Sequence, residues 1–470
     1  MAASSLKVCV IGAGASGIAA CKVLQQHGIV FTCYEAGDRI GGNWVYENTN
    51  GMSSAYRSLH INSCKASIQY SDFPVPEHYP EFPHHSQIAS YFESYAEHFG
   101  IKRHIRFRTR VLLCEPVPGG GWEVTSDDGQ KALYRAVLVA NGHHWSPHWP
   151  QPPFSGTFSG KVMHSHDYRT PEGLEDKRVL IVGFGNSAMD IAVELSRIAP
   201  RTILSVRRGF HVVPKRICGR TSDQRSGVSL PRRVLRRVRR LVPGLRTTPA
   251  WLDRFMLRTM VRLQQGDVSA YGLPQPDHKL LHAHPTISSE LLGRLAHGSI
   301  QVRPNIQSLD GDHVVFNDGS REPVDVIIFC TGYRIDFPFF RPELISAPNN
   351  ELPLYGRVFH PDYPDLLFIG LLQPLGSIIP LAELQSEWVA DYLSGECGLP
   401  GDKEMQTAIR REREAVRKRY GNAPRHTMQV DVGPYAAMVM QERKRGAARA
   451  RQQTAAEAGL VKASVTASNS

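Results

Sequence analysis

Two stretches of the chain share the same order of apolar and polar positions. In residues 7–34 an apolar extended run, Lys7–Ile11, is followed by helical apolar spacing over Ser16–His27 and by a second extended run, Ile29–Tyr34. Short extended apolar runs indicate buried strands, and apolar residues three and four positions apart indicate a helix. The pattern therefore predicts a strand–helix–strand unit with parallel strands.

The second stretch begins at Arg178. Val179–Val182 is again an apolar run, Ala188–Ile198 has helical spacing, and Thr202–Val206 is the next extended run. A chain of 470 residues is too long for a single hydrophobic core. We therefore expect two domains with one such unit in each, and the sequence shows no other internal repeat.

Weaker patterns lie outside the two units. Residues 106–141 hold short strand-like runs between turn signals and predict a small antiparallel sheet that leads back into the first domain. Residues 216–285 are rich in Arg, Pro and His, contain no clean strand, and are expected to form a partly helical insertion. Strand patterns return at residues 300–302, 314–316 and 324–329.

The fold class that follows is α/β, with two dinucleotide-binding (Rossmann-like) domains. We expect the first domain to be discontinuous, over residues 1–160 and 325–440, and the second to cover residues 161–324. Residues 441–470 are rich in Ala, Arg, Gln and Ser, so we expect a disordered tail there.

A glycine-rich turn connects the first strand to its helix. Gly12, Gly14 and Gly17 follow the pattern G-x-G-x-x-G, with Ser16 inside it, and Glu35 stands at the end of the next strand. The glycines permit a tight turn, close approach of backbone to a pyrophosphate, and close packing of helix on strand. Because a carboxylate at the position of Glu35 accepts hydrogen bonds from ribose hydroxyls, this turn suits FAD or NAD.

The second unit repeats this turn as Gly183-Phe184-Gly185-Asn186-Ser187-Ala188, with Ala in place of the third glycine. Its second strand is followed by Arg207 and Arg208 instead of an acidic residue. An arginine pair there suits the 2′-phosphate of NADPH. The alternative is that the arginines only cover the domain surface.

Composition and charge restrict the class of protein. The chain is 41% hydrophobic and 21% charged, as in ordinary globular proteins. Its formal charge of +11 comes mostly from residues 230–262, which hold ten arginines and one aspartate, so the total does not indicate a nucleic-acid partner. The eight cysteines form no C-x-x-C pair or metal-binding cluster, so a reduced, cytoplasmic setting without a metal is expected. The apolar run from Val8 is interrupted by glycines, so we expect no signal peptide there, and the given sequence holds no apolar run of membrane-spanning length.

Two nucleotide units on one chain favour a nicotinamide cofactor that reduces a flavin. Reductases of this layout that pass electrons to a disulfide use a C-x-x-C pair, which is missing here. Dioxygen is then the simplest electron acceptor. We therefore expect FAD in the first domain and NADPH in the second.

A longer signature precedes the second glycine turn. It is Phe158-Ser159-Gly160-Lys161-Val162-Met163-His164-Ser165-His166-Asp167-Tyr168, which matches F-x-G-x-x-x-H-x-x-x-Y/F. On this signature the chain resembles the flavin-containing monooxygenases, one group of the class B flavoprotein monooxygenases, from Lys7 to about Tyr435. The terminal Tyr168 favours the N- and S-oxygenating branch, because Baeyer–Villiger relatives typically have Trp there. The resemblance extends to Gly41-Gly42-Asn43-Trp44, Asn62-Ser63-Cys64-Lys65, Asp72-Phe73-Pro74, Cys330-Thr331-Gly332-Tyr333 and Gln373-Pro374-Leu375-Gly376.

The resemblance implies an NADPH- and dioxygen-dependent enzyme that forms a C4a-hydroperoxyflavin and oxygenates soft nucleophilic N or S atoms of small molecules. It implies that Asn62 is the catalytic residue, hydrogen-bonded to the peroxide, and that Trp44 lies against FAD. His164 and Tyr168 would shape the link between the domains. The other expected FAD contacts are Gly42, Val111, Gly142 and Gln373. Those of the NADPH site or domain junction are Thr331, Gly332 and Tyr333.

Some alternatives stay open at the level of sequence. A Baeyer–Villiger or 2-oxo-acid decarboxylating monooxygenase would act on carbonyl substrates, and a non-catalytic NADPH-binding protein is a more distant alternative that the intact motifs disfavour. The insertion holds an arginine-rich stretch, 232–240, followed by apolar residues over Trp251–Leu257. This combination of charged and apolar residues predicts either a surface that touches anionic membrane or a solvated face over an access channel. A homodimer also stays open.

Overall fold

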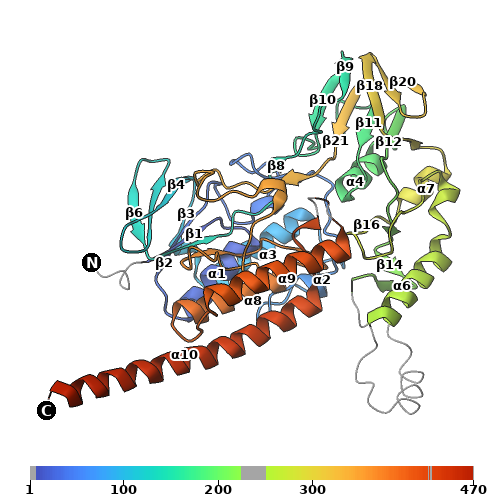
Figure 1. Ribbon diagram of the computed structural model, residues 1–470. Coiled ribbons are helices and arrows are strands. Elements are labelled where there is room, and N and C mark those ends of the chain that lie inside the picture. Colours follow the sequence, from blue (N-terminus) through green and yellow to red (C-terminus); the bar gives the residue numbers. More distant parts are fainter. Residues whose placement is uncertain (1–6, 224–249, 422, 424–425, 469–470) are drawn as a thin grey trace, which may run out of the picture.

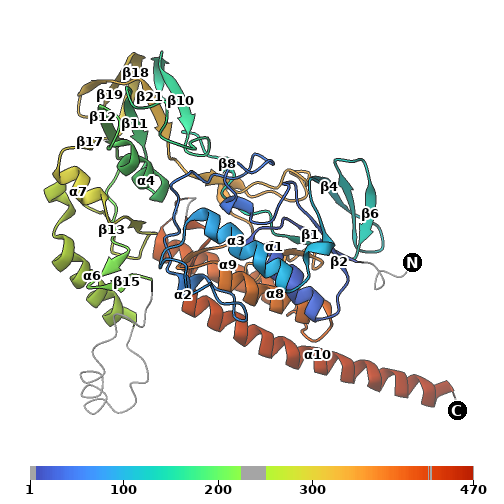
Figure 2. The ribbon, with the colours of Figure 1, turned by 180° about the vertical axis from the view of Figure 1, so that it is seen from behind.

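The computed structural model describes residues 7–223, 250–421, 423 and 426–468. Two lobes contain one five-stranded parallel sheet each, and both are visible in Figure 1. Figure 2 shows the same two lobes from behind. Each predicted strand–helix–strand unit forms the centre of one sheet.

The first sheet has the strand order β23-β7-β1-β2-β3, and every neighbouring pair is parallel. Four of its strands are buried along their whole length, as expected of a parallel sheet covered on both faces. Helix α1 packs against α8. The bounds are β1 Val8–Ile11, α1 Ala15–Gln26, β2 Phe31–Tyr34, α3 His85–His98, β3 Ile105–Arg106, β7 Ala136–Val139, β23 Leu366–Phe368 and α8 Ile379–Leu393.

The expected antiparallel sheet between residues 106 and 141 is confirmed. It consists of β4 (Val111–Pro116), β5 (Trp122–Ser126) and β6 (Lys131–Tyr134), and the chain then re-enters the first sheet as β7.

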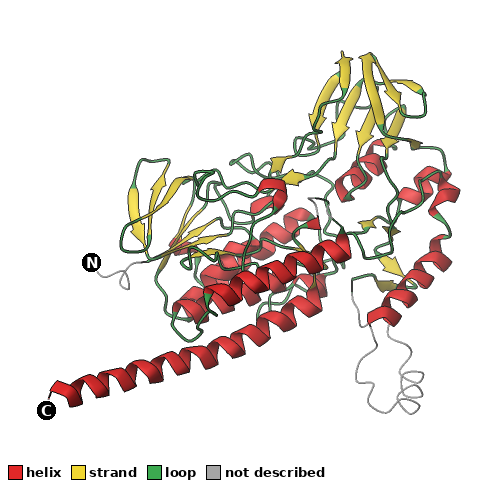
Figure 3. Ribbon diagram, viewed as in Figure 1, coloured by secondary structure: helices red, strands yellow, loops and turns green. Residues whose placement is uncertain are grey.

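The second sheet has the order β10-β21-β11-β12-β17, again all parallel. A four-stranded sheet, β20-β19-β18-β9, belongs to the same lobe (Figure 3). The bounds are β9 Ser155–Phe158, β10 Lys161–His164, β11 Arg178–Val182, α4 Asn186–Leu195, β12 Arg201–Ser205, β17 Gln301–Arg303, β18 Ile306–Gly311, β19 His313–Phe316, β20 Arg321–Pro323 and β21 Val326–Phe329.

The domain boundaries differ from those expected at residues 160 and 325. Strand β9 pairs with β18, and β21 pairs with β10 and β11, so both belong to the second lobe. The chain crosses between lobes near a short antiparallel pair, β8 (Ser146–Pro147) with β22 (Tyr333–Arg334). Strand pairing between distant segments sets these boundaries, and local sequence patterns do not encode such pairing.

The insertion is partly helical in its described part, as expected. It contains short strands and the helix α6, and its arginines at 232–240 lie outside the described residues. The bounds are β13 Val212–Val213, β14 Arg216–Ile217, β15 Arg220–Thr221, α6 Ala250–Gln265, η5 Val268–Tyr271, β16 Thr286–Ile287 and α7 Leu291–Ala296.

The expected disordered tail from residue 441 is wrong for the described residues. After α9 (Asp402–Tyr420), β25 (Gln429–Asp431) pairs with β24 (Gln373–Leu375), and helix α10 then covers Val432–Ser468. Its first part packs on α8, and its end extends away from the body (Figure 1). The reason is that Ala, Arg, Glu, Gln and Lys are strong helix formers, and proline occurs only in the first turn.

Candidate functional site

Both glycine turns open on one cavity of about 800 Å³ between the lobes. The first turn lies at the carboxyl end of β1 and the second at the carboxyl end of β11. In open α/β sheets, ligands bind at the carboxyl ends of the strands. The structure therefore brings both predicted nucleotide sites to the same space.

Two glycines of the first turn, Gly12 and Gly17, leave no room for a side chain. Gly12 has φ +102°, and a Cβ atom there would lie 2.6 Å from the carbonyl oxygen of Ala140. A Cβ on Gly17 would lie 1.8 Å from the carbonyl oxygen of Gly12. Gly14 faces Gly42, where a Cβ would approach the Gly14 Cα to 3.1 Å. The cavity thus reaches bare backbone at the start of α1, which fits a pyrophosphate at a helix N-terminus.

Glu35 lies beside this turn, almost completely buried, and lines the cavity. Its Oε2 accepts a hydrogen bond from the Ala13 amide at 2.8 Å, and its Oε1 accepts one from the Gly37 amide at 2.6 Å. The Asn50 amide nitrogen donates to Oε1 at 3.2 Å. A carboxylate offers about four acceptor positions. Glu35 therefore shapes the turn and keeps capacity for a ribose hydroxyl.

The second turn has the same form. Gly183 has φ +127°, and a Cβ there would lie 2.5 Å from the carbonyl oxygen of Cys330, whereas a Cβ on Gly185 would meet nothing within 4 Å. Open space at Gly185 lets a ligand approach the backbone at the start of α4. Asn186 accepts a hydrogen bond from the Ile287 amide at 2.9 Å, so its side chain fixes β16 to the turn.

Arg207 and Arg208 follow β12, and both are exposed. Neither is among the residues that line the cavity. Arg208 forms an ion pair with Asp277 at 2.9 Å, and its guanidinium lowers the pKa of that carboxyl to about 2.

Asn62 lines the cavity. The Ile61 amide donates to the carbonyl oxygen of Pro83 at 3.0 Å, and the Cys64 amide donates to Asp223 Oδ2 at 2.8 Å, so the backbone on either side is fixed. The Oδ1 atom of Asn62 is buried and has no hydrogen-bond partner in the described part of the chain. Buried polar atoms are rarely left unpaired, so this atom is a fitting partner for a bound group.

Most predicted site residues line the same cavity. From the first lobe these are Gly12, Gly14, Ser16, Glu35, Gly42, Trp44, Asn62, Val111, Gly142 and Gln373. From the second lobe and the junction they are Gly185, Asn186, Ser187, Gly332 and Tyr333. Those outside the lining are Gly17, Gly183, Arg207, Arg208 and Thr331. Gly17 and Gly183 act through close packing, and the Thr331 hydroxyl donates to the carbonyl oxygen of His148 at the junction.

The signature before the second turn also lies at this junction. The hydroxyl of Tyr168 donates to Glu194 Oε2 on α4 at 2.6 Å. His164 is fully buried, its ring lies 5.4 Å from that of Tyr333, and its Nε2 has no partner in the described residues. Burial lowers the pKa of His164 to about 4, so the imidazole is neutral at physiological pH.

A carboxyl group in the cavity escaped the sequence analysis. Asp190 lines the cavity, and the Tyr56 hydroxyl donates to its Oδ2 at 2.5 Å. Burial raises the pKa of Asp190 to about 6. The signal for it was present, because Asp190 stands four residues after Asn186 and so lies on the same face of the helix that follows the glycine turn.

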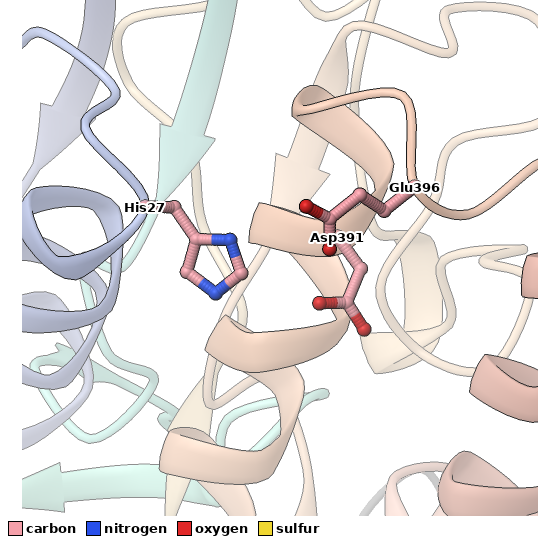
Figure 4. A group of neighbouring side chains, drawn as sticks. All are labelled: His27, Asp391 and Glu396. Atoms are coloured by element: carbon pink, nitrogen blue, oxygen red, sulfur yellow. The ribbon is translucent and has the colours of Figure 1, made fainter.

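A group of possible metal ligands lies elsewhere. His27, Asp391 and Glu396 approach one another near the ends of α1 and α8 (Figure 4), and their ligand atoms lie within 4.8 Å. Asp391 Oδ2 already accepts from Arg443 at 2.7 Å. None of the three lines the cavity between the lobes.

The flavin-binding monooxygenase-like family matches residues 5–442 of the chain. The chain belongs to this family. Flavin-containing monooxygenase 5 of Oryctolagus cuniculus is 38% identical over 439 residues, which is 90% of this chain and 80% of the relative. Flavin-containing monooxygenase 2 of Homo sapiens is 36% identical over 444 residues, or 91% and 81% of the two chains.

Solved structures agree with this assignment. The S-allyl-L-cysteine S-oxygenase from Allium sativum superposes with a TM-score of 0.68 at 27% identity, covering 93% of this chain and 88% of that one. The open structure of cyclohexanone monooxygenase has a TM-score of 0.67 at 16% identity, covering 94% and 98%, and shows the shared fold. The predicted fold class and family are confirmed, and the description of the family agrees with the predicted flavin.

Two further observations concern the whole chain. Among the residues that the structure describes, no helix combines the length and apolar character that a membrane crossing needs. All eight cysteines lie in described residues and are free thiols.

Proposed function

We propose that this monooxygenase transfers one oxygen atom from dioxygen to a nucleophilic nitrogen or sulfur atom of a small molecule. The observation that carries the proposal is the single cavity that both glycine turns and Asn62 line. Relatives support the choice of atoms. One is the dimethylaniline monooxygenase [N-oxide-forming] 2 of Pan troglodytes, which is 36% identical. Another is the S-allyl-L-cysteine S-oxygenase from Allium sativum described above.

The protein has three tasks in this reaction. FAD, when bound and reduced by NADPH, supplies the chemistry that activates dioxygen. The backbone at Gly14 with the N-terminus of α1 would hold one pyrophosphate, and Gly185 with the N-terminus of α4 would hold the other. Both turns open on the same cavity, so the two cofactors would share it.

Asn62 has the role of a neutral hydrogen-bond partner at the site of oxygen transfer. Its Oδ1 is buried and has no partner among the described residues, so a donor bound there would gain a hydrogen bond without displacing one of these. Held by backbone hydrogen bonds on both sides, the side chain is positioned before the reaction starts.

Arg207 and Arg208 are our candidates for the 2′-phosphate of NADPH. Their place after the second strand of the unit is the one used for this contact, and their exposure leaves them accessible to a phosphate. If so, the purified enzyme has a lower KM for NADPH than for NADH. Equal KM values would leave the arginines as surface residues.

We infer that the insertion covers part of the cavity. Leu257 on α6 and Leu281 line the cavity, so part of the insertion forms its wall. Phe255 and Leu263 on α6 are exposed, which is compatible with membrane contact as well. Peripheral membrane contact, a cytoplasmic location and a homodimer stay predictions from the sequence.

The decisive experiment replaces Asn62. We expect Asn62→Ala to retain bound FAD and NADPH-driven flavin reduction but to lose substrate oxygenation, with the consumed NADPH recovered as hydrogen peroxide. The loss is expected to reach about a hundredfold, the order seen when one preorganised hydrogen-bond partner is removed. The measurement compares product formed, peroxide formed and NADPH consumed.

Asn62→Leu is the companion variant, because Leu fills the volume of Asn without its hydrogen bonds. Both variants should behave alike, since the amide and not the volume is proposed to matter. Product yields equal to the parent's in either variant would overturn the role of Asn62. Parallel assays with an amine, a thioether and a ketone separate N- and S-oxygenation from oxygenation of carbonyls.

A further inference from the structure

The segment Asn50–Arg57 of the first lobe runs along the cavity in an alternating manner. Every second residue lines the cavity, namely Asn50, Met52, Ser54 and Tyr56. The residues between them, Gly51, Ser53 and Ala55, do not line it. Gly51, with φ +72°, ends the preceding turn, and from Met52 onward the alternation is that of extended backbone, in which successive residues face opposite sides. This segment, which we call the cavity wall, belongs to none of the sheets.

The carbonyl groups on the far side of the cavity wall are held by the second lobe. His166 Nε2 lies 3.1 Å from the carbonyl oxygen of Gly51. Arg169 Nη2 donates to the carbonyl oxygen of Ser53 at 2.8 Å, and Arg169 Nη1 donates to that of Ala55 at 3.4 Å. The alternate carbonyls of the wall are therefore bound in order by two side chains.

The cavity wall also donates a hydrogen bond to the second lobe. The Arg57 amide donates to the carbonyl oxygen of Arg169 at 2.8 Å. Arg169 Nη1 also donates to the carbonyl oxygen of His166 at 2.6 Å, which fixes the guanidinium to the backbone of the second lobe. Within the described residues Arg169 forms no ion pair with a carboxylate, so its charge is used on carbonyl oxygens.

We propose that Arg169 is a positioning residue that fixes the cavity wall between the two lobes during oxygenation. The inference rests on the proposed function. Hydrogen bonds from an ionised donor are the stronger kind, and here one guanidinium bridges two carbonyl groups of another lobe. Because Tyr56 belongs to the wall and Asn62 follows its last residue by five positions, displacement of the wall also displaces groups that line the cavity.

The test is Arg169→Ala in the full-length, FAD-loaded enzyme. We expect bound FAD and the rate of flavin reduction by NADPH to stay at the parent's values, because neither glycine turn is touched. The yield of oxygenated product per NADPH is expected to fall on the order of tenfold, since small displacements at a reacting centre have large effects. Hydrogen peroxide should account for the remaining NADPH.

Arg57→Ala is the matched control. The Arg57 side chain pairs with Glu172 across the same interface, and both side chains are more than half exposed. Arg57 contributes to the contact with Arg169 only through its backbone amide. Its loss should leave the product yield unchanged. Arg169→Lys, which can reach one carbonyl, should recover part of the yield and serves as the test if Arg169→Ala does not fold.

The outcomes separate the two proposals. A parent enzyme without oxygenated product contradicts the proposed function itself. A parent that forms product, with an unchanged yield in Arg169→Ala or Arg169→Lys, overturns the positioning role. An equal loss in Arg57→Ala would also overturn it, because the effect would then come from any weakening of the interface.

Discussion

At the scale of single residues, the carboxyl group of Asp190 in the cavity lowers the stability of the folded protein when it ionises. Asp190 is half-buried on the cavity surface, and desolvation raises its pKa from 3.8 to about 6, with the Tyr56 hydroxyl and the nearby Lys215 ammonium acting in the opposite direction. Glu194 and Glu290 add to the increase. An acid that is harder to ionise in the folded state destabilises the fold once the pH exceeds its normal pKa.

The prediction at this scale concerns Asp190→Asn, which keeps an oxygen for the Tyr56 hydroxyl but cannot ionise. The parent's stability contribution is complete below about pH 4 and is lost as the pH rises to about 6. The variant should therefore gain stability relative to the parent across this window, by up to about 3 kcal/mol above pH 6. Thermal unfolding of both proteins between pH 4 and 8 measures the gain. A difference that does not change with pH contradicts it.

At the scale of elements, a buried charge cluster joins α1 to α8. Lys22 Nζ lies 3.0 Å from Glu383 Oε1 and 2.8 Å from Asp72 Oδ2. Glu383 Oε2 also accepts from the Ser71 amide at 2.8 Å. Lys22 and Glu383 are both nearly inaccessible to solvent. The helix that follows the first glycine turn is thus held against α8 by charges that water cannot replace.

Removing one partner of this cluster should be costly. We expect Glu383→Ala to lower the free energy of unfolding by about 3 to 5 kcal/mol, because Lys22 would lose a partner while staying buried. Glu387→Ala, one turn further along α8, is the control. Glu387 pairs with Arg443 near the surface, where a pair contributes about 0 to 1 kcal/mol. Denaturant unfolding of the FAD-loaded proteins distinguishes the two, and equal losses would contradict the assignment.

At the scale of the whole molecule, α10 joins the body of the first lobe and then leaves it. Glu442 accepts from the Tyr355 hydroxyl at 2.6 Å, Arg443 donates to Asp391 at 2.7 Å, and Arg449 donates to the carbonyl oxygen of Gly398 at 2.9 Å. Residues 451–456 are all exposed. The helix therefore has an anchored part and a free part.

Truncations test this division. A chain ending after Thr454 should keep its FAD content and its thermal unfolding midpoint, because it retains the anchoring residues. A chain ending after Met440 should lose more than about 5 °C in midpoint, since several buried or partly buried hydrogen bonds disappear together. The same midpoint for both truncated chains would contradict the division.

The local part of this architecture could be predicted from the sequence. Strand and helix periodicity identified both strand–helix–strand units, because side-chain spacing depends only on neighbouring residues. The first glycine of each turn, Gly12 and Gly183, has φ above +100°, a conformation that side chains rarely permit, so this part of the pattern is readable from the sequence. Glu35 was predicted from its place after the second strand, and it lies at the turn as expected.

Other features depended on contacts between distant segments. The boundary at β9 depends on pairing with β18, about 150 residues later, and the order in α10 is reinforced by Arg443 and Arg449 on the body. That Asn62 faces both glycine turns follows from the packing of the lobes, which no local pattern encodes. The sequence by itself located two dinucleotide-binding turns and favoured FAD for one and NADPH for the other, because those signals are short and local. Only the tertiary structure decided that both open on one cavity, because that depends on how the two sheets are placed and held by groups such as Arg169.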